Sequence, residues 1–353
     1  MATAKHRALD RLRRDKRFKK KHAEIARSLE EGSVPELDDA LDREIEDDLL
    51  RLVFTCCHPL LPGEARVALT LRLVAGLSTA EIARAFLVPE PTIAQRIVRA
   101  KRTLADEGVS MSVPRGAELA ARLSSVLEVV YLVFNEGYTA TAGDDWLRPA
   151  LCEEALRLGR TLAELAPDEA EVHGLVALME IQASRSRARV GPRGEPVLLL
   201  DQNRARWDWL LVGRGLAALE RASRLGGAPG FYGLQAEIVA CHARARVASD
   251  TDWERIVSLY EVLGRVAPSP VVELNRAVAV GMARGPAAGL AAVDEVAGDP
   301  ALAEYHLLPS VRGDLLVKLG RLEEARVELE RAASLTRNSR ERELLLKRAA
   351  ACR

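Results

Sequence analysis

The pattern that most restricts how this chain can fold is a pair of short amphipathic helices separated by a brief turn. Ser78 and Glu81 have the capping-box spacing that opens a helix, and this helix is expected to end near Phe86. Glu90 lies at the expected N-cap of the next helix. Pro91 lies at its first position, where a missing N–H has no cost. We therefore predict a helix–turn–helix.

The second of these helices combines an apolar stripe with a polar, basic surface. The stripe repeats at helical spacing and consists of Ile93, Ile97, Ala100 and Leu104. The other faces carry Thr92, Gln95, Arg96, Arg99, Lys101 and Arg102. Arginine can bind guanine O6 and N7, glutamine can bind adenine N6 and N7, and further basic groups neutralise phosphates. These six residues are predicted to bind DNA in the major groove. The alternative is a helical hairpin whose basic face is only solvated.

Helices are expected in the rest of the chain as well. Only 4% of the residues are aromatic, and Ala, Leu, Arg and Glu dominate the composition. A helix is predicted over residues 63–75, and residues after 112 read as successive apolar-periodic helices without strand–turn–strand signals. Residues 319–325 followed by Ala332 resemble the first helix of a tetratricopeptide repeat. Residues 165–167 and 266–268 are expected at seams between helices. The predicted fold class is all-α.

Charge is distributed unevenly along a chain that is neutral in total, with 51 basic and 51 acidic residues. Residues 1–22 have a local charge of +8, residues 23–50 of −9 and residues 51–111 of +3. A basic head of this kind favours a nucleic-acid partner, which the neutral total alone would have argued against.

Several classes of protein are excluded by what the sequence lacks. No apolar run approaches the roughly 18 residues of a membrane span, and no secretory signal follows the basic N-terminus. The five cysteines are odd in number and scattered, which favours a reducing compartment, so we expect a cytoplasmic protein without a membrane partner. No phosphate-binding loop, dinucleotide-binding fingerprint or nucleophile elbow occurs. We predict neither enzymatic activity nor a cofactor.

Two further groups of residues have both a structural and a functional interpretation. Cys56-Cys57-His58 is interpreted as buried packing at a helix end, because adjacent cysteines do not easily bind one tetrahedral metal ion. Residues 135–138 and 144–146 group polar side chains that are compatible with a small-ligand or metal pocket. The favoured interpretation is that Asp144 or Asp145 caps the following helix, while Gly137 permits a tight turn. No metal site is predicted.

Residues 64–104 resemble the fourth conserved region of extracytoplasmic-function sigma factors, which binds the −35 promoter element. The resemblance rests on Gly76-Leu77-Ser78, Glu81-Ile82-Ala83, Val88-Pro89, Thr92 and residues 99–102. Residues 6–14 resemble the end of the second conserved region, which contacts the −10 element. Residues 54–59, 131–138 and 201–202 are similar to the subgroup with a long tetratricopeptide-like C-terminal extension. The resemblance covers almost the whole chain.

The resemblance implies four segments. Residues 1–34 correspond to a remnant of the second region, 35–48 to an acidic linker, 49–111 to the fourth region and 112–353 to the tetratricopeptide-like domain. The helices that grip the polymerase in this family normally precede the remnant, and we expect the natural chain to begin further upstream. The residues implied to contact −10 DNA are His6, Arg7, Arg11, Arg13 and Arg14.

The function that the resemblance implies is promoter recognition and transcription initiation, with promoter DNA and RNA polymerase core as partners. The C-terminal domain is expected to modulate this activity, and a protein or peptide is its expected partner. Two alternatives remain. One is a stand-alone helix–turn–helix regulator with a tetratricopeptide-like sensor domain, and the other is a repeat-protein adaptor whose helix–turn–helix contacts protein.

Overall fold

The structure is a computed structural model that describes residues 51–353 apart from 87, 115–116, 141, 193 and 353. Within that part of the chain, helices make up almost all of the regular structure, and two-residue strands form a single small sheet. The all-α fold class is therefore confirmed. No helix among the described residues is both long and apolar enough to cross a bilayer. The predicted segments 1–34 and 35–48 lie outside the described residues.

The N-terminal described segment contains helical residues 51–56 followed by three helices. These are α3 (Gly63–Leu73), α4 (Thr79–Phe86) and α5 (Glu90–Asp106), and α5 packs on both of the others. The helix predicted over 63–75 is present but ends at Leu73, and Val74 is its C-cap. Gly76 has a φ of 71°, a left-handed conformation that glycine adopts without strain, and it turns the chain toward α4.

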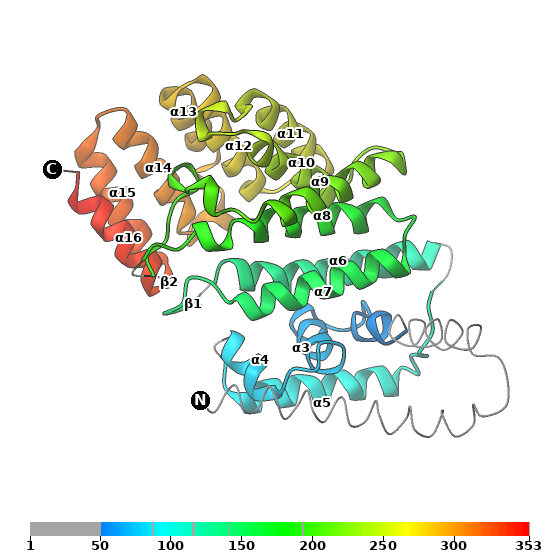
Figure 1. Cartoon of the computed structure of the whole chain (residues 1–353). Helices are drawn as coiled ribbons and strands as arrows, with labels where there is room; N and C mark the ends of the chain where they lie inside the picture. Colours follow the sequence, from blue (N-terminus) through cyan, green and yellow to red (C-terminus); the bar gives the residue numbers. More distant parts are fainter. Residues whose placement is uncertain (1–50, 87, 115–116, 141, 193, 353) are drawn as a thin grey trace, which may run out of the picture. The chain divides into compact units, whose positions relative to one another are not determined.

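The remaining helices form a series in which each contacts the next along the chain (Figure 1). Short 3-10 segments lie between several of them. The α-helices are α6 (Ala117–Tyr138), α7 (Pro149–Leu165), α8 (Ala170–Ser184), α9 (Trp209–Arg224), α10 (Phe231–Arg244), α11 (Trp253–Val266), α12 (Pro270–Arg284), α13 (Pro286–Val296), α14 (Leu307–Lys318), α15 (Leu322–Leu335) and α16 (Ser339–Ala350). The 3-10 segments are η1 (Ser186–Ala188), η2 (Leu199–Asp201), η3 (Arg204–Arg206), η4 (Ala248–Asp250) and η5 (Pro300–Leu302).

Capping residues and prolines set the boundaries of these helices. The seams predicted at residues 165–167 and 266–268 are confirmed, since α7 ends at Leu165 and α11 ends at Val266. Ser269 then caps α12, because its Oγ accepts a hydrogen bond from the Val271 N–H at 3.3 Å. Pro270 follows in the first turn of that helix, where its lost N–H has no intrahelical partner.

Within the described residues, the buried apolar side chains fall into three clusters. The largest is continuous from Phe54 to Ala243 and therefore includes α3, α4 and α5 together with α6 to α10. The other two lie around α10 to α12 and around α12 to α16. The boundary predicted between residues 111 and 112 thus falls within one continuous apolar core, which gives the helix–turn–helix a fixed support.

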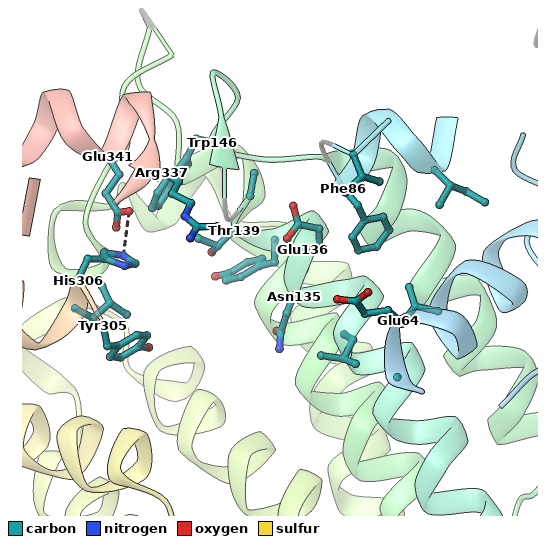
Figure 2. Close-up of a pocket in the computed structure, with 18 of the residues that line it drawn as sticks. Glu64, Phe86, Asn135, Glu136, Thr139, Trp146, Tyr305, His306, Arg337 and Glu341 are labelled. Atoms are coloured by element: carbon teal, nitrogen blue, oxygen red, sulfur yellow. Dashed lines mark ion pairs between the residues drawn. The ribbon is translucent and has the colours of Figure 1, made fainter. Parts of the chain in front are cut away.

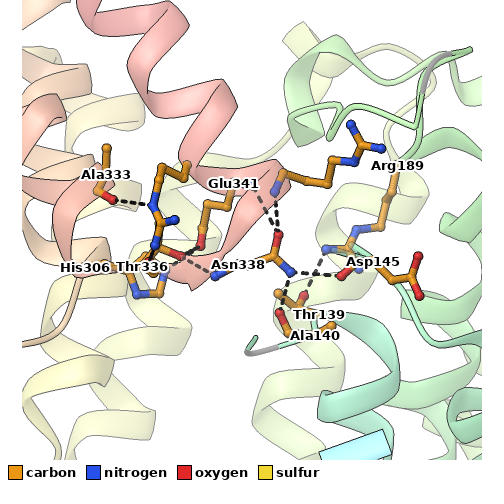
Figure 3. Close-up of polar contacts among 11 residues, drawn as sticks. Thr139, Ala140, Asp145, Arg189, His306, Ala333, Thr336, Asn338 and Glu341 are labelled. Carbon is orange, nitrogen blue, oxygen red and sulfur yellow. Dashed lines mark hydrogen bonds and ion pairs between the residues drawn. The ribbon is translucent and has the colours of Figure 1, made fainter. Parts of the chain in front are cut away.

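A polar clamp joins the last helix to the loop that follows α6 (Figure 3). Strand β2 (Arg337–Asn338) pairs in parallel with β1 (Ala142–Gly143). Asn338 is 1% exposed, and its Nδ2 donates to the carbonyl oxygens of Ala140 at 3.1 Å and Asp145 at 2.9 Å. Its Oδ1 caps α16 by accepting from the N–H groups of Arg340 and Glu341 at 3.1 and 3.2 Å. One side chain therefore fixes two segments that are almost 200 residues apart in sequence.

Candidate nucleic-acid interface

The start of α4 has the reciprocal bonds of a capping box. The Ser78 N–H donates to Glu81 Oε2 at 2.9 Å, and the Glu81 N–H donates to Ser78 Oγ at 3.1 Å. Two N–H groups at the helix start are thereby satisfied. The capping box predicted from the sequence is confirmed, and α4 ends at Phe86 as expected.

The predicted start of α5 is wrong by one position. Pro89 is the N-cap, and Glu90 and Pro91 are the first two helical residues. The Pro89 carbonyl accepts the first intrahelical bond, from the Thr92 N–H at 2.9 Å. The Glu90 carboxylate does not cap the helix but accepts from Thr79 Oγ1 at 2.8 Å, which ties the start of α5 to the start of α4.

The apolar stripe of α5 is buried as predicted. Ile93 and Ile97 are 1% and 6% exposed, and Ala100 and Leu104 complete the buried side. This burial fixes the rotation of α5 about its axis, because only one helix face can satisfy the core. The opposite face is then determined by the helical repeat of about 100° per residue.

Three of the predicted DNA-contacting residues share that outer face. Gln95, Arg99 and Arg102 are spaced at i, i+4 and i+7, and all three are exposed. Lys101 is also exposed but lies on a different flank, and Thr92 is half-buried. Within the described residues, Arg99 and Lys101 make no ion pair, whereas Arg102 lies 3.5 Å from Asp106. The outer face thus presents one amide and two guanidinium groups to solvent.

Arg96 differs from the other arginines of α5. Its Nη2 lies 2.5 Å from Glu64 Oε2 on α3, and its side chain is only 31% exposed. Helical spacing puts it on the flank toward α3 and away from Gln95 and Arg102. In this arrangement Arg96 is held by a carboxylate, and its guanidinium becomes available to another partner only after that ion pair opens. Sequence reasoning did not identify Glu64, since the contact joins residues that are 32 positions apart.

Polar contacts anchor the helix–turn–helix to α6. Arg122 Nη2 donates to the Phe54 carbonyl at 2.9 Å, and Ser125 Oγ donates to the Cys57 carbonyl at 2.5 Å. Arg66 donates to Ser125 Oγ and, at 2.8 Å, to Glu128 Oε2. These bonds satisfy carbonyls at the end of the helical segment 51–56, so they couple the position of α3 to that of α6.

Cys56 and Cys57 pack in the apolar core at this helix end, in agreement with the structural interpretation. They are 0% and 1% exposed, and burial raises both thiol pKa values, that of Cys57 to about 12. Cys57 Sγ lies 3.3 Å from Thr70 Oγ1. Burial and the nearby Arg122 lower the pKa of His58, whose Nδ1 accepts from the Leu60 N–H at 3.3 Å. Each thiol is therefore protonated and unreactive at neutral pH.

Two predictions near residue 140 are wrong. Helix α7 has Arg148 as its N-cap, without a side-chain cap from Asp144 or Asp145. Asp144 instead accepts from Ser339 Oγ at 2.9 Å. Gly137 lies inside α6 rather than in a turn, and a Cβ there would lie 2.6 Å from the Cys152 backbone nitrogen. Its role is to let α6 and α7 approach closely.

The alternative interpretation of this region, a pocket, agrees with a cavity of about 1320 Å³ (Figure 2). One wall comes from α3, α4 and α5 and includes Glu64, Phe86 and Arg96. The opposite wall comes from α6 and the loop after it, from the residue that follows η1, from the start of α14 and from β2. It includes Asn135, Tyr138, Thr139, Trp146, Arg189, Tyr305, His306 and Arg337. No group of three or more potential metal ligands occurs in the described part of the chain.

The remaining predicted site residues, His6, Arg7, Arg11, Arg13 and Arg14, lie outside the described residues. What the structure does define is an all-α protein with an exposed basic helix on a helix–turn–helix, the general form of a DNA-binding factor.

Comparison with known proteins specifies the family. Residues 51–104 match the protein family described as sigma-70, region 4, which confirms the resemblance of residues 64–104 to the fourth sigma region. Residues 122–223 match a family of unknown function, DUF6596. The chain is 45% identical over 334 residues to an uncharacterized protein of Rhizobium meliloti (strain 1021), a match covering 94% of this chain and 78% of that relative. The chain belongs to the family of that relative, and it is a sigma-like DNA-binding factor.

Proposed function

We propose that this protein is a sigma factor of the extracytoplasmic-function type that directs RNA polymerase to promoters. The observation that carries the proposal is the outer face of α5, where Gln95, Arg99 and Arg102 are exposed on the second helix of a sigma-70 region 4 domain. A region 4 domain is a DNA-binding regulatory module, and the mechanism requires no covalent chemistry.

The proposed roles follow from side-chain chemistry and position on α5. Gln95 and Arg99 bind base edges of the −35 element, since an amide fits adenine and a guanidinium fits guanine. Lys101 and Arg102 bind phosphates and add salt-dependent affinity. Thr92 contacts the DNA at the start of the helix. Arg96 joins these contacts after leaving Glu64, which costs little because both partners are partly exposed.

The −10 contacts and the polymerase contacts are part of the same proposal. By resemblance, the basic residues His6, Arg7, Arg11, Arg13 and Arg14 contact −10 DNA, and the polymerase delivers both DNA-binding regions to the promoter. The tetratricopeptide-like C-terminal domain modulates the activity. This last point is supported by the hydrogen bonds between α6 and the segment that includes Phe54, Cys57 and Arg66.

The direct test is promoter binding by Arg99→Ala. Promoters are first selected from DNA randomised at the −35 element, using the full chain bound to core polymerase. Affinity is then measured on the selected promoter and on random DNA. We expect Arg99→Ala to cost about 1–3 kcal/mol on the promoter and much less on random DNA. The matched control is Arg214→Ala, which removes an exposed arginine from α9, outside the interface. Equal losses on both DNAs would mean that Arg99 binds phosphate and reads no base.

The partner is tested by purifying the natively expressed protein through a C-terminal tag and identifying co-purified chains by mass spectrometry. Polymerase subunits are expected. Their absence, together with tight and salt-dependent DNA binding by the protein alone, would favour the stand-alone regulator. About four phosphate contacts predict a slope near −3.6 for log affinity against log salt. A slope near zero would favour the adaptor that contacts protein.

A further inference from the structure

Arg189 is a buried cation that has no buried counter-charge among the residues that the structure describes. The residue directly follows η1 in the chain. It is 8% exposed, and it lines the cavity between the helix–turn–helix and the C-terminal helices. It donates to the Tyr138 carbonyl and to Thr139 Oγ1, the latter at 3.0 Å. Among the described residues, no carboxylate lies within ion-pair distance of this guanidinium. Burial lowers its pKa, which reports the cost of keeping the charge there.

Neighbouring arginines do not neutralise the positive charge of Arg189 but add to the positive potential around it. Arg185 is 7% exposed, and its Nε is buried without a hydrogen-bond partner in the described part of the chain. Burial lowers the pKa of both Arg189 and Arg204, and the positive charge of Arg185 lowers both further. Aromatic rings compensate in part: the Arg189 Cζ lies 3.6 Å from the centroid of Tyr138 and 5.5 Å from that of Trp146. Ring faces attract cations more weakly than a carboxylate does in a dry site.

The cavity beside Arg189 has the composition of a site for an organic ligand. Its volume of about 1320 Å³ exceeds the roughly 300–1,000 Å³ of typical ligand pockets. Aromatic and aliphatic side chains line it on both walls, among them Phe86, Tyr138 and Trp146. The Trp146 Nε1 is buried and unpartnered within the described residues, so a hydrogen-bond acceptor is missing beside Arg189. Arg337 of β2, an exposed residue, lines the same cavity (Figure 2).

The acidic side chains of the cavity wall do not neutralise the positive charges of Arg189 and Arg337. Glu304 is exposed. The other three each contact a basic side chain: Glu64 with Arg96, Glu136 with Arg148, and Glu341 with His306. None of these pairs involves Arg189 or Arg337, which therefore remain available to a negatively charged ligand.

We propose that this cavity binds a small organic anion with an apolar body, and that Arg189 and Arg337 hold its anionic group. The ring systems of Tyr138 and Trp146 and the apolar side chains of both walls enclose the apolar part. Because Phe86, Ile93 and the Arg96–Glu64 pair form the opposite wall, bound ligand contacts the DNA-reading element directly. Such differential contacts are what an effector needs to shift an equilibrium between two positions of that element.

The site is tested with a pair of fluorescent probes that differ in one charged group. One is 8-anilinonaphthalene-1-sulfonate, and the other is its neutral parent, N-phenyl-1-naphthylamine. The full-length chain is titrated with each, without DNA or polymerase, so this proposal and the proposed function can fail independently. We expect the sulfonate to saturate at one molecule per chain and to bind at least about tenfold more tightly than the neutral probe.

Variants locate the binding at the proposed groups. Arg189→Lys keeps the charge but loses the guanidinium fork, and we expect roughly a tenfold loss of sulfonate affinity with neutral-probe affinity unchanged. Arg337 is exposed and makes no ion pair with the described residues, so Arg337→Gln should leave the fold intact. We expect this variant to lose about threefold in sulfonate affinity. The matched control Arg331→Gln removes another exposed arginine, from α15, and should bind both probes like the unchanged protein.

Four results would overturn the proposal: equal affinity for the two probes, unchanged sulfonate affinity in Arg337→Gln, an equal loss in Arg331→Gln, or failure of both 1-naphthoate and 1-naphthyl phosphate to displace the sulfonate. If Arg189→Lys loses its helical circular dichroism signal, the sulfonate affinity of Arg337→Gln alone tests the site. Competition with 1-naphthoate and 1-naphthyl phosphate then distinguishes a carboxylate ligand from a phosphate ligand. If neither displaces the sulfonate, the probe binds elsewhere and the site is rejected.

Discussion

Arg99 and Arg102 of α5 are exposed, whereas Arg185 and Arg189, which follow α8, are buried among aromatic rings. Arg99 has no ion pair among the described residues and faces solvent, while Arg189 is 8% exposed and bonded to the α6 backbone. An exposed charge adds little to folding stability and remains available to a partner. A buried charge must be held by specific neighbours, and its loss affects the structure around it.

This difference predicts that substitutions in the two regions will affect different properties. Changes on the outer face of α5 are expected to alter DNA affinity and leave stability unchanged. Changes at buried polar or close-packed positions of the C-terminal helices are expected to alter stability first. Variants that lower stability from α5, or that leave it unchanged at the buried positions, would contradict the comparison.

The largest effect is expected at Asn338, the side chain that clamps α16 to the loop after α6. Asn338→Leu removes the α16 cap and leaves the buried carbonyl of Ala140 and the carbonyl of Asp145 without this donor. We expect a loss of about 4 kcal/mol in the free energy of unfolding, measured by urea denaturation. The control is Asn203→Ala, which removes an exposed cap at η3 whose Oδ1 accepts from the Ala205 N–H, and it should cost under about 1 kcal/mol. Similar losses in both variants would mean that the clamp adds nothing beyond an ordinary cap.

A pair of glycines tests close packing against open helix surface. A Cβ at Gly137 would meet the Cys152 backbone nitrogen at 2.6 Å, so Gly137→Ala should force α6 and α7 apart and cost about 3 kcal/mol. Gly213 lies in α9, where an added Cβ would have no neighbouring atom within 4 Å, and Gly213→Ala should stabilise by up to about 1 kcal/mol. Thermal denaturation measures both the expected loss of stability in Gly137→Ala and the expected gain in Gly213→Ala. A Gly137→Ala protein as stable as the unchanged one would show that the two helices can separate without cost.

A pH-dependent loss of stability is expected from His242 on α10. Burial, and then the nearby Arg185 and Arg204, lower its pKa from 6.5 to about 4. Between these values the unfolded chain binds the extra proton, so the stability present above pH 6.5 declines as the pH falls toward 4. At pH 5 the decline due to this residue amounts to about 2 kcal/mol. His242→Gln should remove that part of the pH dependence in urea denaturation at pH 7 and pH 5. An unchanged dependence would assign it to other groups.

Local sequence signals predicted the helix–turn–helix well. The capping box at Ser78, the end of α4 at Phe86 and the buried stripe of α5 all follow from short-range rules that tertiary contacts did not override. The start of α5 was missed by one residue, because the Glu90 carboxylate bonds to Thr79 and leaves the cap position to Pro89. That bond joins two helices, which a pattern within one helix does not reveal.

Long-range geometry accounts for what the sequence did not predict. Gly137 in a polar stretch indicates a turn by local rules, yet its role is set by contact with α7. The Asn338 clamp and the Glu64–Arg96 pair join residues distant in sequence, and neither has a local signal. The cavity was anticipated only in part. Residues 135–138 and 144–146 indicated a polar pocket, while Arg189 and the helix–turn–helix wall became evident only when the chain was folded.

The smallest expected effects concern Arg96. It is intermediate between the exposed and the buried arginines, because it is on α5 but held by Glu64. Arg96→Ala should cost about 1 kcal/mol at one promoter position, the low end for a base contact, since opening the ion pair offsets part of the gain. Glu64→Gln should act in the opposite direction and raise promoter affinity by less than about 1 kcal/mol, because it frees the guanidinium. Both are measured as polymerase-dependent binding to the selected promoter and to single-base variants of it. In the double variant the effect of Glu64→Gln should disappear, because the residue acts only through Arg96. If Arg96→Ala instead weakens binding equally on promoter and random DNA, Arg96 is a phosphate contact and α5 reads the promoter through Gln95 and Arg99 alone.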